Sequence, residues 1–133
     1  MEISPAKARE MVLAGKSIKG AIITGNLYLS GTKIGNLDLS YAIIEGSLNL
    51  KDAIVSFDVE LESITIKGNL DLTDAAIEGY LNLRNAIVKD GLNLITKKGP
   101  YCIYIEPERA TAVHHANPRI PILSSGGLAQ LPK

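Results

Sequence analysis

The chain reads AAIEGYLNLRN at residues 75–85 and AIVKDGLNLIT at residues 86–96, and these two stretches decide the fold. Each is a copy of one unit of about eleven residues. The unit has a small residue with an aliphatic one two positions later, a corner, a Leu-Asn-Leu strand and a second corner. Variants of the unit occur seven times between Ala21 and Thr96, with another clear copy at residues 42–50. A fixed period of this kind indicates an architecture of stacked repeats.

Alternation with a period of two assigns the side chains of each unit to an inner and an outer side. In the copy at residues 42–50, Ala42 and Ile44 face inward and Ile43 faces outward, and Asn49 faces outward between two inward leucines. The same rule places these further residues inside: Leu27, Leu29, Leu37, Leu39, Val59, Leu61, Ile64, Ile66, Leu70 and Leu72. Glycine, asparagine and aspartate recur at the corners, where a sharp turn favours left-handed backbone.

A strand that turns every five or six residues cannot pair within a flat sheet, but it can pair with the next coil of its own chain. Two units supply four faces and about 22 residues per coil, so equivalent side chains stack about 4.8 Å apart in parallel ladders. The sequence therefore predicts an all-β fold, a four-sided parallel β-helix solenoid of about three and a half coils in residues 21–96.

The small-then-aliphatic pairs resemble those of the pentapeptide-repeat family. The matching pairs are Ala42/Ile44, Ala53/Val55, Ala75/Ile77 and Ala86/Val88. This resemblance covers residues 21–96 and implies a right-handed, four-sided β-helix. Two features depart from the family pattern, because leucine stands in the Leu-x-Leu faces where the family usually has alanine or serine, and each pair of faces has one extra residue.

We expect four segments along the chain: an N-terminal capping helix and entry at residues 1–20, the β-helix body at 21–96, a last strand and C-terminal cap at 97–106, and an extended tail at 107–133. The helix is predicted from Ala6 to Ala14, with Ser4 as N-cap, Pro5 in the first turn and Gly15 as the end. It is expected to cover the first coil, since the ends of a coil stack expose apolar core and strand edges.

The tail contains neither the repeat nor a helical period. Its four prolines and paired glycines indicate a segment that is either disordered or draped over another surface. Ile120, Ile122 and Leu123 favour draping, because they are apolar.

The outward position of one strand type carries Ile22, Ile43, Thr65 and Ile87. These residues form a mostly β-branched apolar stripe on one face, and exposed apolar patches often mark interfaces. One reading is that β-branched residues serve strand propensity alone. The other is that the stripe is covered, either by the tail through Ile120, Ile122 and Leu123 or by a second copy of the chain.

The other outward rows are polar. Asp38, Glu60 and Asn82 share one face, and Tyr28, Asn49, Asp71 and Asn93 share another. Such rows are ordinary solvated surface, but some pentapeptide-repeat proteins imitate duplex DNA and bind topoisomerases, so the resemblance implies this alternative. Residues 36–96 hold ten acidic against four basic side chains, which fits mimicry, whereas the net charge of zero opposes it and also argues against direct nucleic-acid binding.

Isolated residues suggest little chemistry. Phe57 replaces the usual corner glycine, either in a bulged corner where it packs against a neighbour or in a local binding feature, and packing is the preferred reading. Cys102 is interpreted as a small buried hydrophobe in a reducing compartment such as the cytoplasm. His114 and His115 are adjacent and point opposite ways on an extended chain, so we expect no metal site.

We therefore expect a non-enzyme, since no Ser/His/Asp order, P-loop or dinucleotide motif occurs. Neither a cofactor site nor a membrane-crossing segment is predicted, because no apolar stretch approaches about 20 residues. The preferred reading is an interaction protein that presents its ladders to a protein partner, in the first place a second copy. The alternatives are the DNA-mimicking regulator and a scaffold subunit that polymerises end to end as bactofilins do, against which the N-terminal helix argues.

Overall fold

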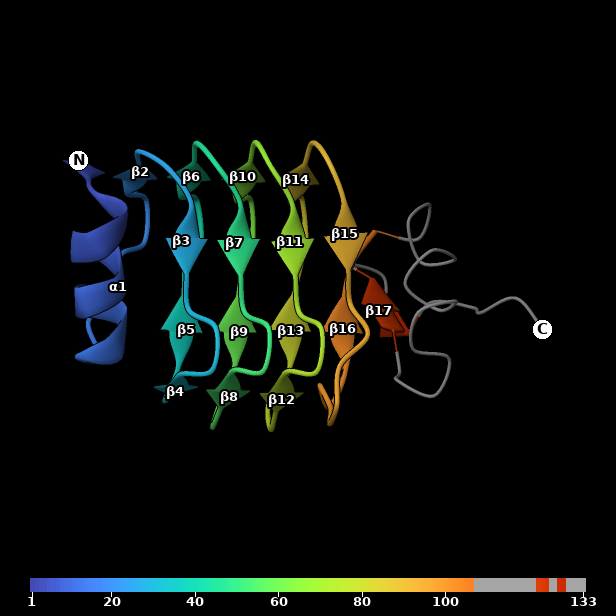
Figure 1. Cartoon of the computed structure of the whole chain (residues 1–133). Coiled ribbons are helices and arrows are strands. Elements are labelled where there is room, and N and C mark those ends of the chain that lie inside the picture. Colours follow the sequence, from blue (N-terminus) through green and yellow to red (C-terminus); the bar gives the residue numbers. More distant parts are fainter. Residues whose placement is uncertain (107–121, 125–126, 129–133) are drawn as a thin grey trace.

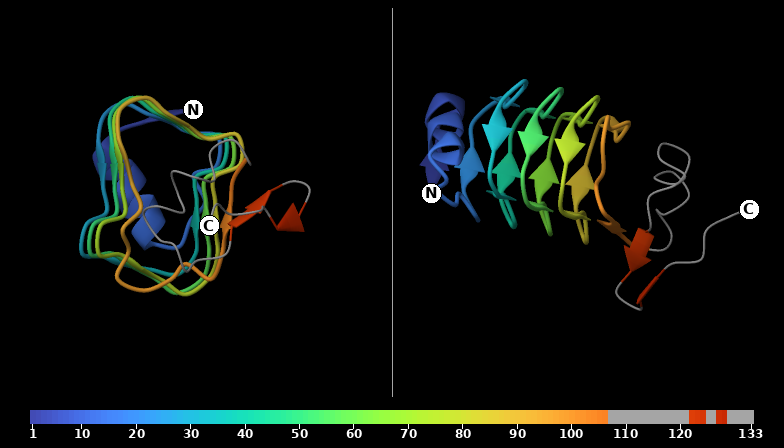
Figure 2. Two further views of the ribbon diagram at one scale, coloured as in Figure 1. Left: turned by 90° about the vertical axis from the view of Figure 1, so that its right-hand side faces the viewer. Right: turned by 90° about the horizontal axis from the view of Figure 1, so that it is seen from below.

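The computed structural model describes residues 1–106, 122–124 and 127–128. Within these residues the chain forms a parallel β-solenoid with one short helix at the N-terminus, as the eleven-residue period predicts (Figure 1). Seen along the solenoid axis, the successive coils lie over one another (Figure 2). The right-handed sense of the coil stays a prediction.

The strands fall into four sheets, here named A to D. Sheet A contains, in spatial order, β1 (Glu2–Ile3), β2 (Ile22–Ile23), β6 (Ile43–Ile44), β10 (Thr65–Ile66) and β14 (Ile87–Val88). Sheet B contains β3 (Leu27–Tyr28), β7 (Leu48–Asn49), β11 (Leu70–Asp71) and β15 (Leu92–Asn93). Sheet C contains β4 (Lys33–Ile34), β8 (Ile54–Val55) and β12 (Ala76–Ile77). Sheet D contains β5 (Leu37–Asp38), β9 (Val59–Glu60), β13 (Leu81–Asn82), β16 (Ile103–Tyr104), β17 (Ile122–Ser124) and β18 (Gly127–Leu128).

Each strand of the coil stack pairs in parallel with the equivalent strand of the next coil. On sheet A, Ile43 is the register partner of Thr65, and Thr65 is the partner of Ile87, so one coil spans 22 residues. The first coil is one residue shorter, because only Gly35 and Asn36 connect β4 to β5, whereas three residues connect β8 to β9. The predicted coil length is thereby confirmed.

The two-residue corners owe their sharp turn to a left-handed residue. Positive φ values near 60° occur at the same corner position in six of the seven units, at Gly31, Tyr41, Asp52, Ser63, Asp74 and Asn85. A tyrosine and a serine therefore adopt a backbone conformation that costs most side chains energy, and the parallel hydrogen bonds on both sides of the corner hold them there.

The core consists of aliphatic side chains. Every residue assigned to the interior from the alternation is buried, including Leu27, Leu50 and Ile66, whose side chains are 0% exposed. All six aromatic residues lie in the described part of the chain, and none belongs to this core.

Phe57 corrects a prediction, because its side chain is 63% exposed rather than packed. The residue sits in the middle of a three-residue corner, and its backbone stacks like the others: its N–H donates to the Gly35 oxygen at 2.9 Å, and its oxygen accepts from Gly79 at 2.8 Å. The corner continues the coil stack, so its side chain projects to solvent.

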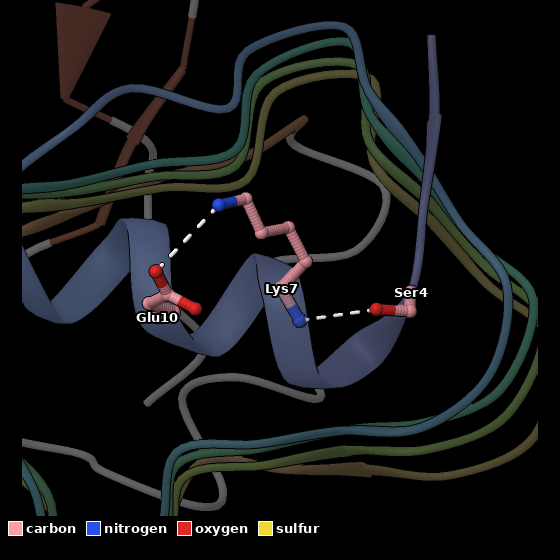
Figure 3. Close-up of polar contacts among 3 residues, drawn as sticks. All are labelled: Ser4, Lys7 and Glu10. Atoms are coloured by element: carbon pink, nitrogen blue, oxygen red, sulfur yellow. Dashed lines mark hydrogen bonds and ion pairs between the residues drawn. The ribbon is translucent and has the colours of Figure 1, made fainter.

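Helix α1 (Pro5–Leu13) covers the first coil, as predicted (Figure 1). The Ser4 hydroxyl accepts a hydrogen bond from the Lys7 backbone N–H at 3.1 Å, and the Lys7 ammonium lies 3.6 Å from the Glu10 carboxylate (Figure 3). This N-cap satisfies one of the free N–H groups of the first turn. Ala8 and Val12 are the buried side chains of the helix.

The two ends of the chain add strands that the repeat does not contain. Residues 2 and 3 form β1, which pairs with β2 and adds a rung to sheet A before the helix begins. At the other end, a strand forms within residues 97–106, where one is expected: β16 pairs with β13 of sheet D. The tail contributes β17, which pairs in parallel with β16, and β18, which pairs antiparallel with β17. No helix in the described part of the chain is both long and apolar enough to span a bilayer.

Candidate interaction surface

Sheet A carries the outward apolar row that the sequence predicts. Parallel pairing sets Ile22, Ile43, Thr65 and Ile87 in direct register, one above the other on successive coils. We call these four residues the apolar ladder. It is bounded at the N-terminal end by Glu2 of β1, the register partner of Ile22.

The members of the apolar ladder cover one another only in part. Ile22, Ile43 and Thr65 are half-buried, and Ile87 at the last rung is 54% exposed. Their backbone groups are used in the sheet, but no side chain of the ladder contributes to the interior. The ladder is therefore an apolar surface with no role in the solenoid core.

A second row lies two residues further along each strand and, by alternation, on the same face. It consists of Thr24, Glu45, Lys67 and Lys89, all exposed, and we call it the charged row. Its backbone N–H groups remain hydrogen-bonded to the preceding coil, as in the 2.9 Å bond from Glu45 to Ile23. The ammonium of Lys67 lies 3.6 Å from the Glu45 carboxylate.

The described tail residues of the predicted interface lie on another sheet. Ile122 and Leu123 lie in β17, paired with β16 at the end of sheet D rather than on sheet A. Ile120 lies outside the described residues, as do His114 and His115. The apolar ladder is thus the part of the predicted site that the structure assembles.

The outward polar rows have a local structural role that the sequence interpretation missed. In five of the seven residues of these rows, a side-chain oxygen accepts a hydrogen bond from the backbone N–H two residues later, which secures the following corner. The bonds run from Ser40 N–H to Asp38, Lys51 to Asn49, Thr73 to Asp71, Arg84 to Asn82 and Ile95 to Asn93, at 2.8–3.1 Å. These residues are hence committed to turns as well as being surface.

Sheet D adds a cluster of aromatic and charged side chains. The ring of Tyr104 packs edge-to-face against Tyr80, with centroids 5.3 Å apart, and the Arg84 guanidinium lies 4.5 Å over the Tyr104 ring. The Glu62 carboxylate accepts hydrogen bonds from Tyr41 and Asn82, each at 3.2 Å. Most of the polar groups of this face bind one another.

The electrostatics of sheet D reflect burial beside carboxylates. Burial, followed by the negative charges of Glu60 and Asp58, raises the pKa of Tyr80 to about 12. The adjacent Cys102 thiol raises the pKa of Tyr104, and burial raises the pKa of Cys102 itself. Cys102 is 4% exposed, which confirms the prediction of a small buried side chain, and its raised pKa disfavours the reactive thiolate.

Two polar atoms in this cluster lie buried without a partner. Glu60 Oε1 and Arg84 Nε make no hydrogen bond to any described residue. Both atoms are buried, so a ligand at the surface could not reach them. The exposed side chains of sheet A are accessible to such a ligand.

A shallow groove of about 540 Å³ crosses sheet C. Ile54 and Ala76 line it together with Asp52 and Asp74 from the adjacent corners and with Lys97 and Lys98. Lys98 is paired with Glu78 at 2.9 Å. In the described part of the chain, no group of three or more His, Cys, Asp or Glu side chains is placed to hold a metal ion.

The sheet D cluster could have been found by extending the 22-residue register past Thr96. That register aligns Glu60, Asn82 and Tyr104 on successive coils. The repeat pattern fades after Leu94, so the sequence alone assigns residues 97–106 to a last strand and cap rather than to another full rung.

Comparisons with known proteins identified no relative of this chain. No protein-family model matches it, and neither the curated proteins nor the solved structures contain a match. What stands is the fold, a parallel β-solenoid with turns of 22 residues.

Proposed function

We propose that this protein is a non-catalytic interaction protein that uses the apolar ladder of sheet A to bind another protein surface, in the first place a second copy of itself. The carrying observation is the in-register row of Ile22, Ile43, Thr65 and Ile87 on the outer face. When a partner removes the remaining surface of these β-branched side chains from water, the free energy of the complex is lowered.

The surroundings of the ladder support this proposal. Exposed polar residues border it on both sides, with Glu45 and Lys67 in the charged row and Tyr41 at the corner that precedes β6. An apolar centre with a polar, solvent-accessible rim is the usual anatomy of a protein interface.

We also propose a divergent relationship to the pentapeptide-repeat proteins, supported by the Ala/aliphatic pairs and the 22-residue coil. Leucine at the Leu-x-Leu faces sets this chain apart from that family. A reducing compartment such as the cytoplasm suits the free thiol of Cys102.

The alternatives have weaker support. DNA mimicry needs a continuous array of free negative charge, whereas Asp38 and Asp71 accept hydrogen bonds from their own turns and Arg84 interrupts sheet D. End-to-end polymerisation needs two open solenoid ends, and α1 lies over the first coil (Figure 1).

The test is light scattering on a sizing column over a concentration series. The double variant Ile43→Asp/Ile87→Asp places carboxylates in the ladder and is expected to remain monomeric at concentrations where the native chain associates. The matched control is Ile54→Asp/Ile95→Asp, which alters two isoleucines that are 44% and 55% exposed but lie outside sheet A. This control is expected to associate like the native chain.

Circular dichroism of each variant checks the fold. If the Asp variant unfolds, Ile43→Thr/Ile87→Thr replaces it, since Thr65 occupies the same ladder without disturbing the pairing. A native chain that stays monomeric throughout, or ladder variants that associate as the native chain does, would contradict the proposal.

A further inference from the structure

The charged row of sheet A carries information about how two copies would pack. Along the solenoid it reads Thr24, Glu45, Lys67 and Lys89, one residue per coil. The acidic residue Glu45 and the basic residue Lys67 occupy the second and third of four rungs. The two charges are therefore related by reversal of the row about its midpoint.

A symmetric dimer buries the same patch on both copies. When two sheet A faces meet about a two-fold axis parallel to the strands, the solenoids run antiparallel and each row faces itself in reverse order. The first rung then meets the fourth, and the second meets the third. Glu45 of each copy faces Lys67 of the other, and Ile43 faces Thr65.

We propose that this protein forms an antiparallel two-fold dimer through sheet A, in which Glu45 of each copy pairs with Lys67 of the second copy. The inference rests on the proposed function, and it adds the partner, the orientation and the register. The ion pair within one chain, 3.6 Å long and exposed, leaves both groups able to take a second partner.

The charges favour this register over the two half-coil shifts of the antiparallel arrangement. A shift of the axis by half a coil in one direction sets Glu45 against Glu45 of the second copy. The opposite shift sets Lys67 against Lys67 and, on either side of that contact, Glu45 against Lys89 of the second copy. A parallel arrangement brings the charged row against the corner column on the other side of the ladder, where Glu45 meets Tyr41. Like charges placed opposite each other weaken association, so both half-coil shifts are less favourable than the proposed register, which has two opposite-charge contacts and no like-charge contact.

The size of the face limits the strength of the dimer. Four rungs about 4.8 Å apart span about 15 Å, so the buried area falls below that of a standard stable interface. We therefore expect weak, concentration-dependent association with rapid exchange, for which charge complementarity decides the register.

Charge reversal with mixing tests the proposal directly. Glu45→Lys alone sets two lysine side chains against each other at both symmetry-related contacts, and Lys67→Glu alone sets two glutamates together. Each single variant is expected to self-associate at least about tenfold more weakly than the native chain, because both contacts become repulsive. An equimolar mixture of the two variants is expected to form a heterodimer more tightly than either variant self-associates, since both of its contacts are between opposite charges. One sets the introduced lysine against the introduced glutamate, and the other is the native contact of Lys67 with Glu45.

The double variant Glu45→Lys/Lys67→Glu complements the mixture. It exchanges the two charges within one chain, so both contacts across the two-fold axis are again between opposite charges. It is expected to self-associate near native affinity. The double variant also restores the ion pair within one chain, so recovery together with heterodimer formation in the mixture shows that the two positions face each other across copies. A loss that persists shows that each position contacts something else.

The matched control is the exposed pair Glu78 and Lys98, which lies near sheet C and has the same intrachain relation at 2.9 Å. Glu78→Lys and Lys98→Glu are expected to leave self-association unchanged, alone or mixed. Sedimentation velocity measures all of these variants, and circular dichroism confirms that each is folded.

The outcomes separate this inference from the proposed function. Ile43→Asp/Ile87→Asp could abolish association while Glu45→Lys/Lys67→Glu associates as weakly as the single charge variants. In that case sheet A is an interface and the antiparallel register is wrong. Single charge variants that associate like the native chain overturn the register as well. A native chain that does not associate removes both.

Discussion

Sheets A and D are built over the same aliphatic core, but the side chains on their outer faces differ in the contacts that they make with the rest of the fold. On sheet D, Asp38 and Asn82 accept hydrogen bonds from the turns that follow them, and Tyr104 packs against Tyr80. On sheet A the ladder isoleucines form no comparable contact with any described residue and keep part of their surface in water. A side chain that makes structural contacts is explained by the fold and is therefore a poor marker of function. An exposed apolar row without such contacts is a better marker of function.

The largest effects should come from the core beneath the two faces, which is equivalent in both sheets. Ile44 on sheet A and Leu81 on sheet D are each 0% exposed. Ile44→Ala and Leu81→Ala are each expected to lower the free energy of unfolding by about 2–5 kcal/mol, because each leaves a cavity. Denaturant unfolding followed by circular dichroism measures both. A loss below about 1 kcal/mol at either position would show that one sheet is not part of the common core.

The polar face should respond to loss of a turn contact. Asp38→Ala removes the acceptor that binds the Ser40 N–H at 3.0 Å. It is expected to destabilise the fold by about 1 kcal/mol, the usual net value of such a bond. Asp38→Asn keeps the acceptor and is the matched control, with no loss expected in the same unfolding experiment. Equal losses in the two variants would show that the carboxylate charge, not the turn, matters.

The apolar face should respond in association rather than in stability. Thr65→Ile makes the ladder continuous and is expected to tighten self-association several-fold, since each copy buries more apolar surface. Ala76→Ile adds a similar side chain at the outward position of sheet C and should leave association unchanged. Sedimentation equilibrium compares the two, and a tighter dimer from Ala76→Ile would move the interface to the groove on sheet C.

The smallest effect is a shift in titration on sheet D. The pKa of Tyr80 is about 12 in the folded chain, above its ordinary value of 10.0, so the folded state favours the protonated phenol. The resulting stabilisation is complete below pH 10 and is lost as the pH rises from 10 to 12. Tyr80→Phe should remove the late component from a phenolate absorbance titration and reduce the loss of stability in that window. An unchanged absorbance curve would mean that Tyr80 titrates with the other tyrosines.

Much of the fold could be predicted because the eleven-residue repeat determines which positions face the core and where the chain turns. Inward positions such as Leu48 and Ala75 must be apolar in every coil, so alternation identifies them, and Ser4 with Pro5 identifies the helix start. The apolar ladder follows from the same register. Its role as an interface is not contained in the pattern, since strand propensity alone could select the same residues.

The features that could not be predicted lie where the period breaks. β17 pairs with β16 at a separation of 19 residues, between Ile103 and Ile122, instead of 22, so no repeat marks it. Strand β1 has only two residues, too few for a periodicity. The prediction for Phe57 is wrong because a large apolar side chain favours burial, whereas its position on the corner directs it outward.

The most direct test of the interface is methyl NMR of isoleucine-labelled protein as its concentration rises. Weak association in rapid exchange should shift the methyl signals of Ile22, Ile43 and Ile87, while those of Ile54 and Ile95, exposed elsewhere, stay in place. Shifts confined to Ile54 and Ile95, or no shift at any concentration, would contradict an interface on sheet A.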